Sequence, residues 1–250
     1  MEPNKIFTTQ ELAKYLKLNE KTIIKMAQSG HLPGVKIGNQ WRFHLKAIDN
    51  FLLRNLSRAP DEQLDSVIKT DVDMTPLSRL TNPNLIELDS DAKDIDAVLE
   101  KLAEIAYKEG LTASEENLFK GLKKREGVLS TAIGSNIAIP HTRNPSPDLF
   151  SESRVIILLS KRGIDYDAPD RMPVHVFFMP CAPNEHTHIR LLARISKFFH
   201  MPNITEKLMR AKTKDEVIRL LLRFDREYMY GSIKTNTKQQ IITGDKKYAG

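Results

Sequence analysis

Between residues 6 and 53, apolar residues first recur with the spacing of helices and then alternate as in strands. The segment "TTQELAKYL" begins with threonines suited to N-capping and predicts a helix of about two turns. The segment "EKTIIKMAQSG" predicts a second helix, with Gly30 as its C-cap. Next, "LPGVKIGNQWRFH" predicts two short strands around a tight turn at Gly38-Asn39, and "LKAIDNFL" predicts a third helix. The pattern indicates a small module of two joined helices and a hairpin.

Farther along the chain, strands alternate with long helices. The strand-like segments are "LIELD", "NIAIP", "RVIILLS" and "VHVFFMP", and helical periods lie between and after them. Such alternation predicts an α/β layer structure. The region before it carries three prolines and no sustained period, which is typical of a linker. We therefore expect a small domain at residues 1–55, a linker at 56–83, a larger domain at 84–228 and a flexible tail at 229–250.

The composition indicates a soluble cytoplasmic protein. With 250 residues and 40% hydrophobic content, the chain can bury a sizeable core. Its longest apolar run, near Val155 to Leu159, is far shorter than the roughly 20 residues of a membrane-spanning helix. The N-terminus is acidic and polar, unlike a signal peptide. Cys181 is the only cysteine, which excludes an internal disulfide and a cysteine-based zinc cage.

Positive charge is concentrated at the start of the chain. Residues 1–58 contain ten Lys and Arg against four Asp and Glu, which accounts for the whole net charge of +6. A small basic module beside a balanced larger one suggests an anionic partner, and nucleic acid is the commonest choice. Two helices, a tight turn and a wing-like hairpin form a winged helix-turn-helix, whose second helix would lie in the major groove of DNA.

The candidate DNA contacts lie on one face of the second helix and in the hairpin. Lysines there can neutralise phosphates, while Thr and Gln can reach base edges. The candidates are Lys21, Thr22, Lys25, Gln28 and Arg42. The segment from "FTTQELAKYL" to "LKAIDNFL" resembles the excisionase-family DNA-binding domain, related to MerR-type winged helices, and the resemblance implies DNA binding. The alternative is a helix-turn-helix reused for dimerisation or protein docking, so a homodimer stays an open expectation.

Four of the seven histidines fall between residues 141 and 188. A metal hydrolase is one interpretation, because His141, His186 and His188 could supply three imidazoles to zinc. No HExxH helical pair accompanies them, and His186 and His188 cannot share a helix face, so at most one should face His141. The chain has no G-x-S-x-G elbow, and Cys181 lies in an apolar context. We therefore expect no bound metal and no cofactor.

His141, which follows the strand-like run "IAIP", is a candidate nucleophile. A neutral imidazole can accept a phosphoryl group near pH 7, and the resulting N–P bond stays labile. Such a site needs positive and hydrogen-bonding groups around the phosphoryl oxygens. The sequence offers Arg125 in "KKREG", the backbone N–H groups of Gly134 and Ser135, and a second imidazole downstream.

The segments "LKKREGVLSTAIGSNIAIPHTR" and "GIDYDAPDRMPVHVFFMPCAPNEHTHIRLLARISKFF" resemble the enzyme IIA domain of the mannitol/fructose and nitrogen-regulatory class of the bacterial phosphotransferase system. The resemblance implies a mixed β-sheet flanked by helices. It also implies that His141 is the phosphorylated histidine, Arg125 the active-site arginine and His188 the second active-site histidine. Phospho-HPr or its nitrogen-branch counterpart is the implied donor. Thr142-Arg143 stands where family members often carry glycine or alanine after the histidine.

Together the two resemblances predict a transcription regulator that combines a phosphohistidine carrier with a DNA-binding module. It would be a component of a phosphotransfer chain more than a free-standing catalyst. The alternative is a relay protein whose N-terminal module docks protein and never contacts DNA.

Overall fold

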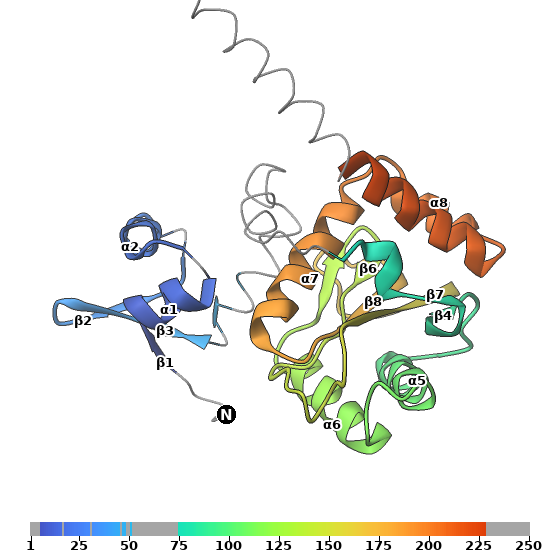
Figure 1. The fold of residues 1–250 in the computed structure, drawn as a ribbon, viewed down its shortest axis with the longest axis horizontal. Helices are drawn as coiled ribbons and strands as arrows, with labels where there is room; N and C mark the ends of the chain where they lie inside the picture. Colours follow the sequence, from blue (N-terminus) through green and yellow to red (C-terminus); the bar gives the residue numbers. More distant parts are fainter. Residues whose placement is uncertain are drawn as a thin grey trace, which may run out of the picture.

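The computed structural model describes residues 6–16, 18–30, 32–45, 47–48, 51 and 75–228. Residues 56–74 of the predicted linker and the predicted tail at 229–250 lie outside the described residues. Within these ranges the chain folds into a small N-terminal unit and a larger α/β unit, shown in Figure 1. None of the helices described there is long and apolar enough to cross a bilayer.

The N-terminal unit packs two helices against a three-stranded sheet. Its elements are β1 (Ile6–Thr8), α1 (Thr9–Leu16), α2 (Glu20–Gln28), β2 (Val35–Ile37) and β3 (Gln40–His44). The strands are antiparallel in the order β1-β3-β2. The first two predicted helices and the hairpin lie where the sequence predicts them, whereas the third, over residues 45–52, falls partly outside the described residues. The pattern missed β1, because three residues are too short to show a period.

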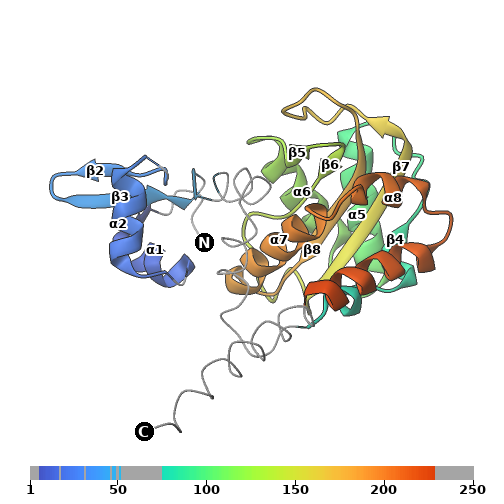
Figure 2. The same cartoon turned by 90° about the horizontal axis from the view of Figure 1, so that it is seen from above.

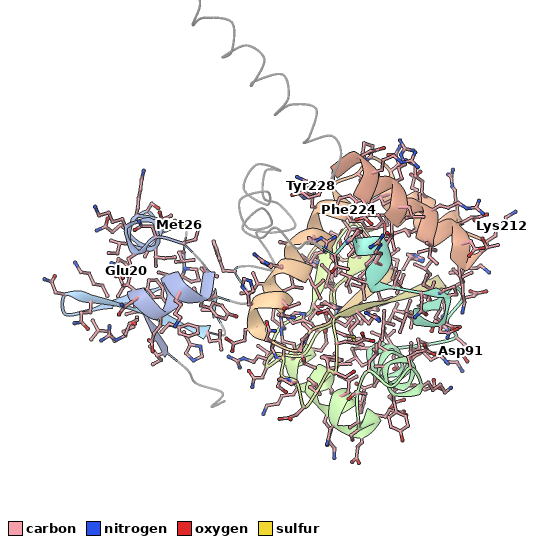
Figure 3. All side chains as sticks on the ribbon, viewed as in Figure 1. Glu20, Met26, Asp91, Lys212, Phe224 and Tyr228 are labelled. Carbon is pink, nitrogen blue, oxygen red and sulfur yellow. The ribbon has the colours of Figure 1, made fainter. Side chains whose placement is uncertain are left out.

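Local side chains start both helices of this unit. The backbone N–H of Thr8 donates to Glu11 Oε2 at 2.8 Å, and that of Glu11 donates to Thr8 Oγ1 at 3.2 Å, which forms a capping box before α1. Asn19 caps α2 by accepting from the N–H of Lys21 at 2.9 Å. The core beneath them contains Phe7, Leu12, Ile23, Phe43 and Ile48. Figure 3 labels Glu20 and Met26 near the two ends of α2.

The larger unit is a five-stranded mixed sheet with helices on both faces, as predicted. Strand order is β4-β7-β8-β6-β5; β4 with β7 and β6 with β8 are parallel pairs, and the other pairs are antiparallel. The strands are β4 (Ile86–Glu87), β5 (Ala132–Gly134), β6 (Ile137–Ala138), β7 (Arg154–Ile164) and β8 (Val174–Cys181). The helices are η1 (Leu77–Leu80), η2 (Pro83–Leu85), α5 (Ile95–Lys108), α6 (Glu115–Glu126), α7 (Glu185–Phe199), α8 (Ile204–Arg210) and a helix over 214–228.

Strand β7 shows why the sheet is covered on both sides. Alternate side chains of a strand point to opposite faces. Val155, Ile157 and Leu159 pack with the buried residues of α7, α8 and the helix over 214–228, whereas Ile156 and Leu158 pack with those of α5 and α6. Figure 2 shows the two helical layers on either side of the sheet. A strand buried on both faces is a continuous apolar run, as "VIILL" is.

The predicted linker is wrong at its C-terminal end. Leu77 is fully buried in the core of the larger unit, and the N–H groups of Leu77 and Ser78 each donate to the carboxylate of Asp225 at 2.8 Å. Arg194 of α7 donates to the carbonyl of Thr75, and its Nη2 lies 3.7 Å from Asp225 Oδ1. The folded part therefore begins no later than residue 75. The pattern missed this segment because 3-10 helices of three or four residues have no readable period.

Candidate active site

His141 lies just beyond the end of β6, an inner strand of the sheet next to the edge strand β5. Residues Ile137 and Ala138 of β6 pair with β8, and the N–H of Ile139 donates to the carbonyl of Thr131 at 3.0 Å. Pro140 has no N–H, so regular pairing stops there. The chain then places the His141 side chain inside the domain, where it is 2% exposed.

Two hydrogen bonds fix the tautomer of His141. Its Nδ1 lies 2.8 Å from the carbonyl oxygen of Ile139, and a carbonyl can only accept, so Nδ1 carries the proton. Arg125 Nε donates to Nε2 of His141 at 3.1 Å, which requires a lone pair on Nε2. Both contacts give the same answer: the unprotonated nitrogen of the ring is Nε2.

The structure brings His188 and Arg125 together around His141. His188 lies in the first turn of α7, which begins where Asn184 accepts from the N–H of Thr187 at 2.9 Å. The centroids of the two imidazole rings are 5.1 Å apart. Arg125, near the end of α6, is 3% exposed and also donates from Nη1 to the carbonyl of Leu129 at 2.8 Å. Three predicted site residues from three separate segments thus form one buried cluster.

Both imidazoles of the cluster are held neutral. Burial, then the positive charge of Arg125, then His188 lower the pKa of His141 well below its usual 6.5. Burial and Arg125 lower the pKa of His188 to about 4. At pH 7 neither ring carries an extra proton, so the Nε2 lone pair of His141 is available for bond formation.

These shifts predict that acid weakens the fold. Below about pH 6.5 the unfolded chain binds a proton at position 188 that the folded chain binds only near pH 4, so stability falls as pH falls across this window. We expect His188 alone to lower the free energy of unfolding by about 2 kcal/mol between pH 7.5 and 5. Urea unfolding at both pH values measures this loss. A His188→Gln variant with the same pH dependence as wild type would contradict it.

A buried carboxylate next to Arg125 was missed by the sequence reasoning. Glu126 accepts from the N–H and Oγ1 of Thr131 at 2.7 and 2.6 Å and from the hydroxyl of Tyr166 at 3.3 Å. Burial raises the pKa of Glu126, against the lowering effect of the Thr131 hydrogen bonds. These bonds hold the turn whose Leu129 carbonyl orients Arg125. The adjacent "RE" pair is the signal that could have identified it.

The prediction for Gly134 and Ser135 needs correction. They lie at the turn between β5 and β6, at the other end of β6 from His141. The N–H of Ser135 donates to Asp170 Oδ2 at 2.7 Å, and a Cβ on Gly134 would lie 3.1 Å from the same oxygen. Strand β6 runs from this turn toward His141, so the turn and the imidazole lie beyond opposite ends of the strand. The N–H of Ser135 therefore serves the turn, and neither residue is carried into the proposed site.

The other candidates for chemistry in the larger unit have structural surroundings. His175 Nδ1 lies 2.8 Å from the carbonyl of Ser160, and Cys181 is fully buried, which raises the pKa of its thiol. Among the described residues, no three His, Cys, Asp or Glu side chains are grouped as metal ligands. The described residues therefore offer no set of ligands for the zinc ion of the metal-hydrolase interpretation.

The predicted DNA contacts divide between an exposed helix face and a half-buried strand. Lys21, Thr22, Lys25 and Gln28 are exposed on α2, opposite the buried Ile23 and Ala27. Arg42 of β3 is half-buried, and its guanidinium donates to the carbonyl of Trp41 at 3.0 Å and to Gln40 Oε1 at 2.6 Å. The helix face is therefore available to a ligand, while Arg42 would have to exchange its present contacts.

Comparisons with known proteins agree with both units. Residues 6–56 match the model of a helix-turn-helix domain. The fructose-specific EIIA component of the phosphotransferase system from Haloferax volcanii is 31% identical over 149 residues, which cover 58% of this chain and 94% of that protein. A nitrogen regulatory protein from Pseudomonas aeruginosa is 28% identical over 128 residues, or 50% of this chain and 80% of the relative.

The fold of the larger unit is shared with solved enzyme IIA structures. The nitrogen regulatory protein IIA-Ntr from Neisseria meningitidis superposes with a TM-score of 0.53 at 24% identity, over 58% of this chain and 97% of that one. Residues 79–224 match the family model described as "Phosphoenolpyruvate-dependent sugar phosphotransferase system, EIIA 2". Because this match spans more than half of the chain, the chain belongs to the EIIA 2 family of the sugar phosphotransferase system.

Proposed function

We propose that the protein accepts a phosphoryl group on Nε2 of His141 from a phosphohistidine carrier, phospho-HPr or its nitrogen-branch counterpart. The observation that carries this proposal is the lone pair on Nε2, fixed by Ile139 and approached by Arg125 at 3.1 Å. An activated nucleophile beside a cation is what phosphoryl transfer requires.

In the transfer step, the Nε2 lone pair forms a bond to phosphorus while the N–P bond of the donor breaks. The bonding electron pair returns to the donor imidazole, so no oxidant or further reactant is needed. Arg125 gives up its hydrogen bond to Nε2 and turns its N–H groups to the phosphoryl oxygens. Nδ1 keeps its proton and its hydrogen bond to the carbonyl of Ile139, which stabilises the positive charge that develops on the ring.

His188 supports the step as a neutral neighbour. Its ring centroid lies 5.1 Å from that of His141, and its low pKa keeps it uncharged at pH 7. A neutral imidazole can donate one hydrogen bond to a phosphoryl oxygen. We propose this contact as the role of His188, with Arg125 supplying the charge.

The first test is the position of the phosphoryl group. Wild-type protein incubated with phosphoenolpyruvate, enzyme I and HPr is expected to take up one phosphoryl group per chain. Nitrogen and phosphorus NMR should place it on Nε2 of one histidine, because Nδ1 of His141 is occupied by Ile139. Phosphate on Nδ1, or on any other side chain, would refute the assignment.

We further propose that α2 binds DNA and that phosphorylation regulates this binding. The face with Lys21, Thr22, Lys25 and Gln28 is exposed and has the spacing of a recognition helix. Phosphorylation adds about −1.5 to −2 charge, which can change how domains or partners dock. Equal DNA affinity of phosphorylated and unphosphorylated protein across a salt series would exclude the coupling.

The Lys21→Ala/Lys25→Ala double variant is expected to bind duplex DNA more weakly at every sequence. Each lysine that neutralises a phosphate contributes about 0.9 to the slope of log affinity against log salt, so the slope should decrease by about two. Fluorescence anisotropy at salt concentrations from about 50 to about 200 mM measures this slope. The matched control is Lys120→Gln, on an exposed position of α6. The control should keep the wild-type slope. If the double variant keeps it too, α2 is not the DNA-binding helix.

A protein-docking role for the N-terminal unit has one observation in its favour. Ile6, Val35 and Ile37 are 55%, 64% and 65% exposed, although all three are large and apolar. Pairing of Val35 with Arg42 and of Ile6 with His44 places them on one outer face of the sheet. DNA is polar and anionic, so this face fits a protein or a second copy better than DNA. If the N-terminal unit binds a protein partner and the affinity of the chain for DNA does not change with salt, the relay function is favoured.

A further inference from the structure

A small enclosed cavity of about 150 Å³ lies beside the active site. It is bounded by α6 and by the segment directly after His141. Three basic side chains line it, Lys124, Arg125 and Arg143, and no carboxylate does. Arg125 also contacts His141, so the cavity and the imidazole share one guanidinium. His141 itself is not among the lining residues.

Arg143 has a buried donor that calls for an acceptor. Its Nη2 is shielded from solvent and has no hydrogen-bond partner among the residues that the structure describes. Buried N–H groups in folded proteins are almost always paired, and an isolated one often marks an absent ion or water. Arg143 is therefore a cation that lines a cavity with no carboxylate among its lining residues, and one of its donors has no partner in the described part of the chain.

The walls of the cavity strengthen any charge interaction inside it. Val128, Leu149 and the methyl group of Thr142 supply apolar surface. The close approach of α6 keeps the space small, because a Cβ on Gly121 would lie 3.3 Å from Cγ2 of Thr142. Coulomb interactions are several times stronger in such surroundings than in water. By contrast, a larger hollow along α5, of about 490 Å³, is lined mostly by carboxylates: Asp91, Asp94, Glu100, Glu104 and Glu115.

We propose that this cavity binds a small tetrahedral oxyanion, held by Arg143, Lys124 and Arg125. Its volume is close to that of a protein cavity that holds a benzene molecule, at about 150 Å³, so a phosphate-sized group fits. Guanidinium groups bind such oxygens through paired, charge-assisted hydrogen bonds. Two sources have this chemistry: free inorganic phosphate, and the phosphoryl group that His141 would carry. The second source rests on the proposed function, and the first does not.

The test titrates the full, unphosphorylated chain with inorganic phosphate by calorimetry. Wild type is expected to bind, and Arg143→Gln to bind about tenfold or more weakly, because one charge-assisted hydrogen bond is lost. Arg143→Lys should recover part of the affinity. Lys120→Gln removes one charge from the same helix outside the cavity and should bind like wild type. No binding by wild type, or equal binding by wild type and Arg143→Gln, overturns the proposal.

Further experiments distinguish free phosphate from the phosphoryl group on His141. They also distinguish a failure of this proposal from a failure of the proposed function. His141→Gln keeps the cavity and cannot be phosphorylated on an imidazole there, so it should still bind phosphate; loss of binding would show that the ion sits on the histidine, against the proposal. Phosphorylated wild type that no longer binds free phosphate would identify the His141 phosphoryl group as the occupant, and retained binding would identify the free ion. A protein that binds phosphate but accepts no phosphoryl group would refute only the proposed function.

Discussion

The His141→Ala variant is expected to take up no phosphoryl group from phosphoenolpyruvate, enzyme I and HPr. The reason is the geometry of Nε2, which carries the lone pair and meets Arg125 inside a buried cluster. The neighbouring ring of His188 has its own lone pair, yet the proposed transfer does not form a bond to it. Radiolabel transfer measures uptake, and label on His141→Ala would refute the assignment of the acceptor.

Variants of the two neighbours should keep the acceptor and lose rate. Removal of one preorganised donor from a transition state costs about 10²–10³ in rate, and we expect Arg125→Gln to fall in this range. His188→Ala should still accept label, more slowly than wild type, because it loses a contact and keeps the nucleophile. Near-UV circular dichroism, measured on these variants and on His141→Gln, checks that each of them is folded. If Arg125→Gln accepts label at the wild-type rate, the guanidinium has no part in the transfer.

Asp225→Ala is expected to destabilise the larger unit by about 3–5 kcal/mol, the largest effect on stability that we predict. The Asp225 carboxylate accepts from the N–H groups of Leu77 and Ser78 at 2.8 Å each and lies 3.7 Å from Arg194. All of these groups are buried. The substitution leaves two backbone donors without their acceptor and removes the buried negative charge beside the Arg194 guanidinium. Urea unfolding at constant temperature, with the free energy of unfolding extrapolated linearly to zero urea, measures the difference between the variant and wild type.

The matched control is Glu227→Ala on the same helix. Glu227 Oε1 accepts from Arg223 Nε at 2.7 Å, and both side chains are exposed. An exposed pair of this kind contributes about 0–1 kcal/mol, so the control should unfold close to wild type. Asp225→Asn, which retains one acceptor oxygen, should fall between the two. Equal stability of Asp225→Ala and Glu227→Ala would show that the buried contacts carry no net free energy.

The elements with a clear period were predictable from the sequence, and so was the class of the fold. The run "VIILL" of β7, the long helix α5 and the capped helices of the N-terminal unit all have local signals that agree with their final packing. What failed were short pieces. The two 3-10 helices, β1 and β5 each span three or four residues, too few to show a period. Asp225 holds η1 from far along the chain, whereas Asn82 caps η2 locally.

The candidate site shows the same division. A motif and a resemblance indicated His141, Arg125 and His188, and the structure brings them together. The sequence suggests Gly134 and Ser135 because backbone N–H groups near a glycine can bind phosphate. The direction of β6 cannot be read from the sequence, and it places that turn away from His141. Glu126 could not be identified from the sequence because its relevance depends on burial and on Tyr166, forty residues farther along the chain.

The contact of Asp225 with Leu77 and Ser78 also joins the first and last segments of the larger unit. On the helix that carries Asp225, Phe224 and Tyr228, labelled in Figure 3, stack at 5.6 Å between ring centroids. A domain whose ends meet can be opened elsewhere and reconnected through them. A circular permutant that links residue 228 to residue 75 and opens at an exposed position of the 143–149 segment should therefore fold, whereas a fragment trimmed to 79–224 should not keep its full stability.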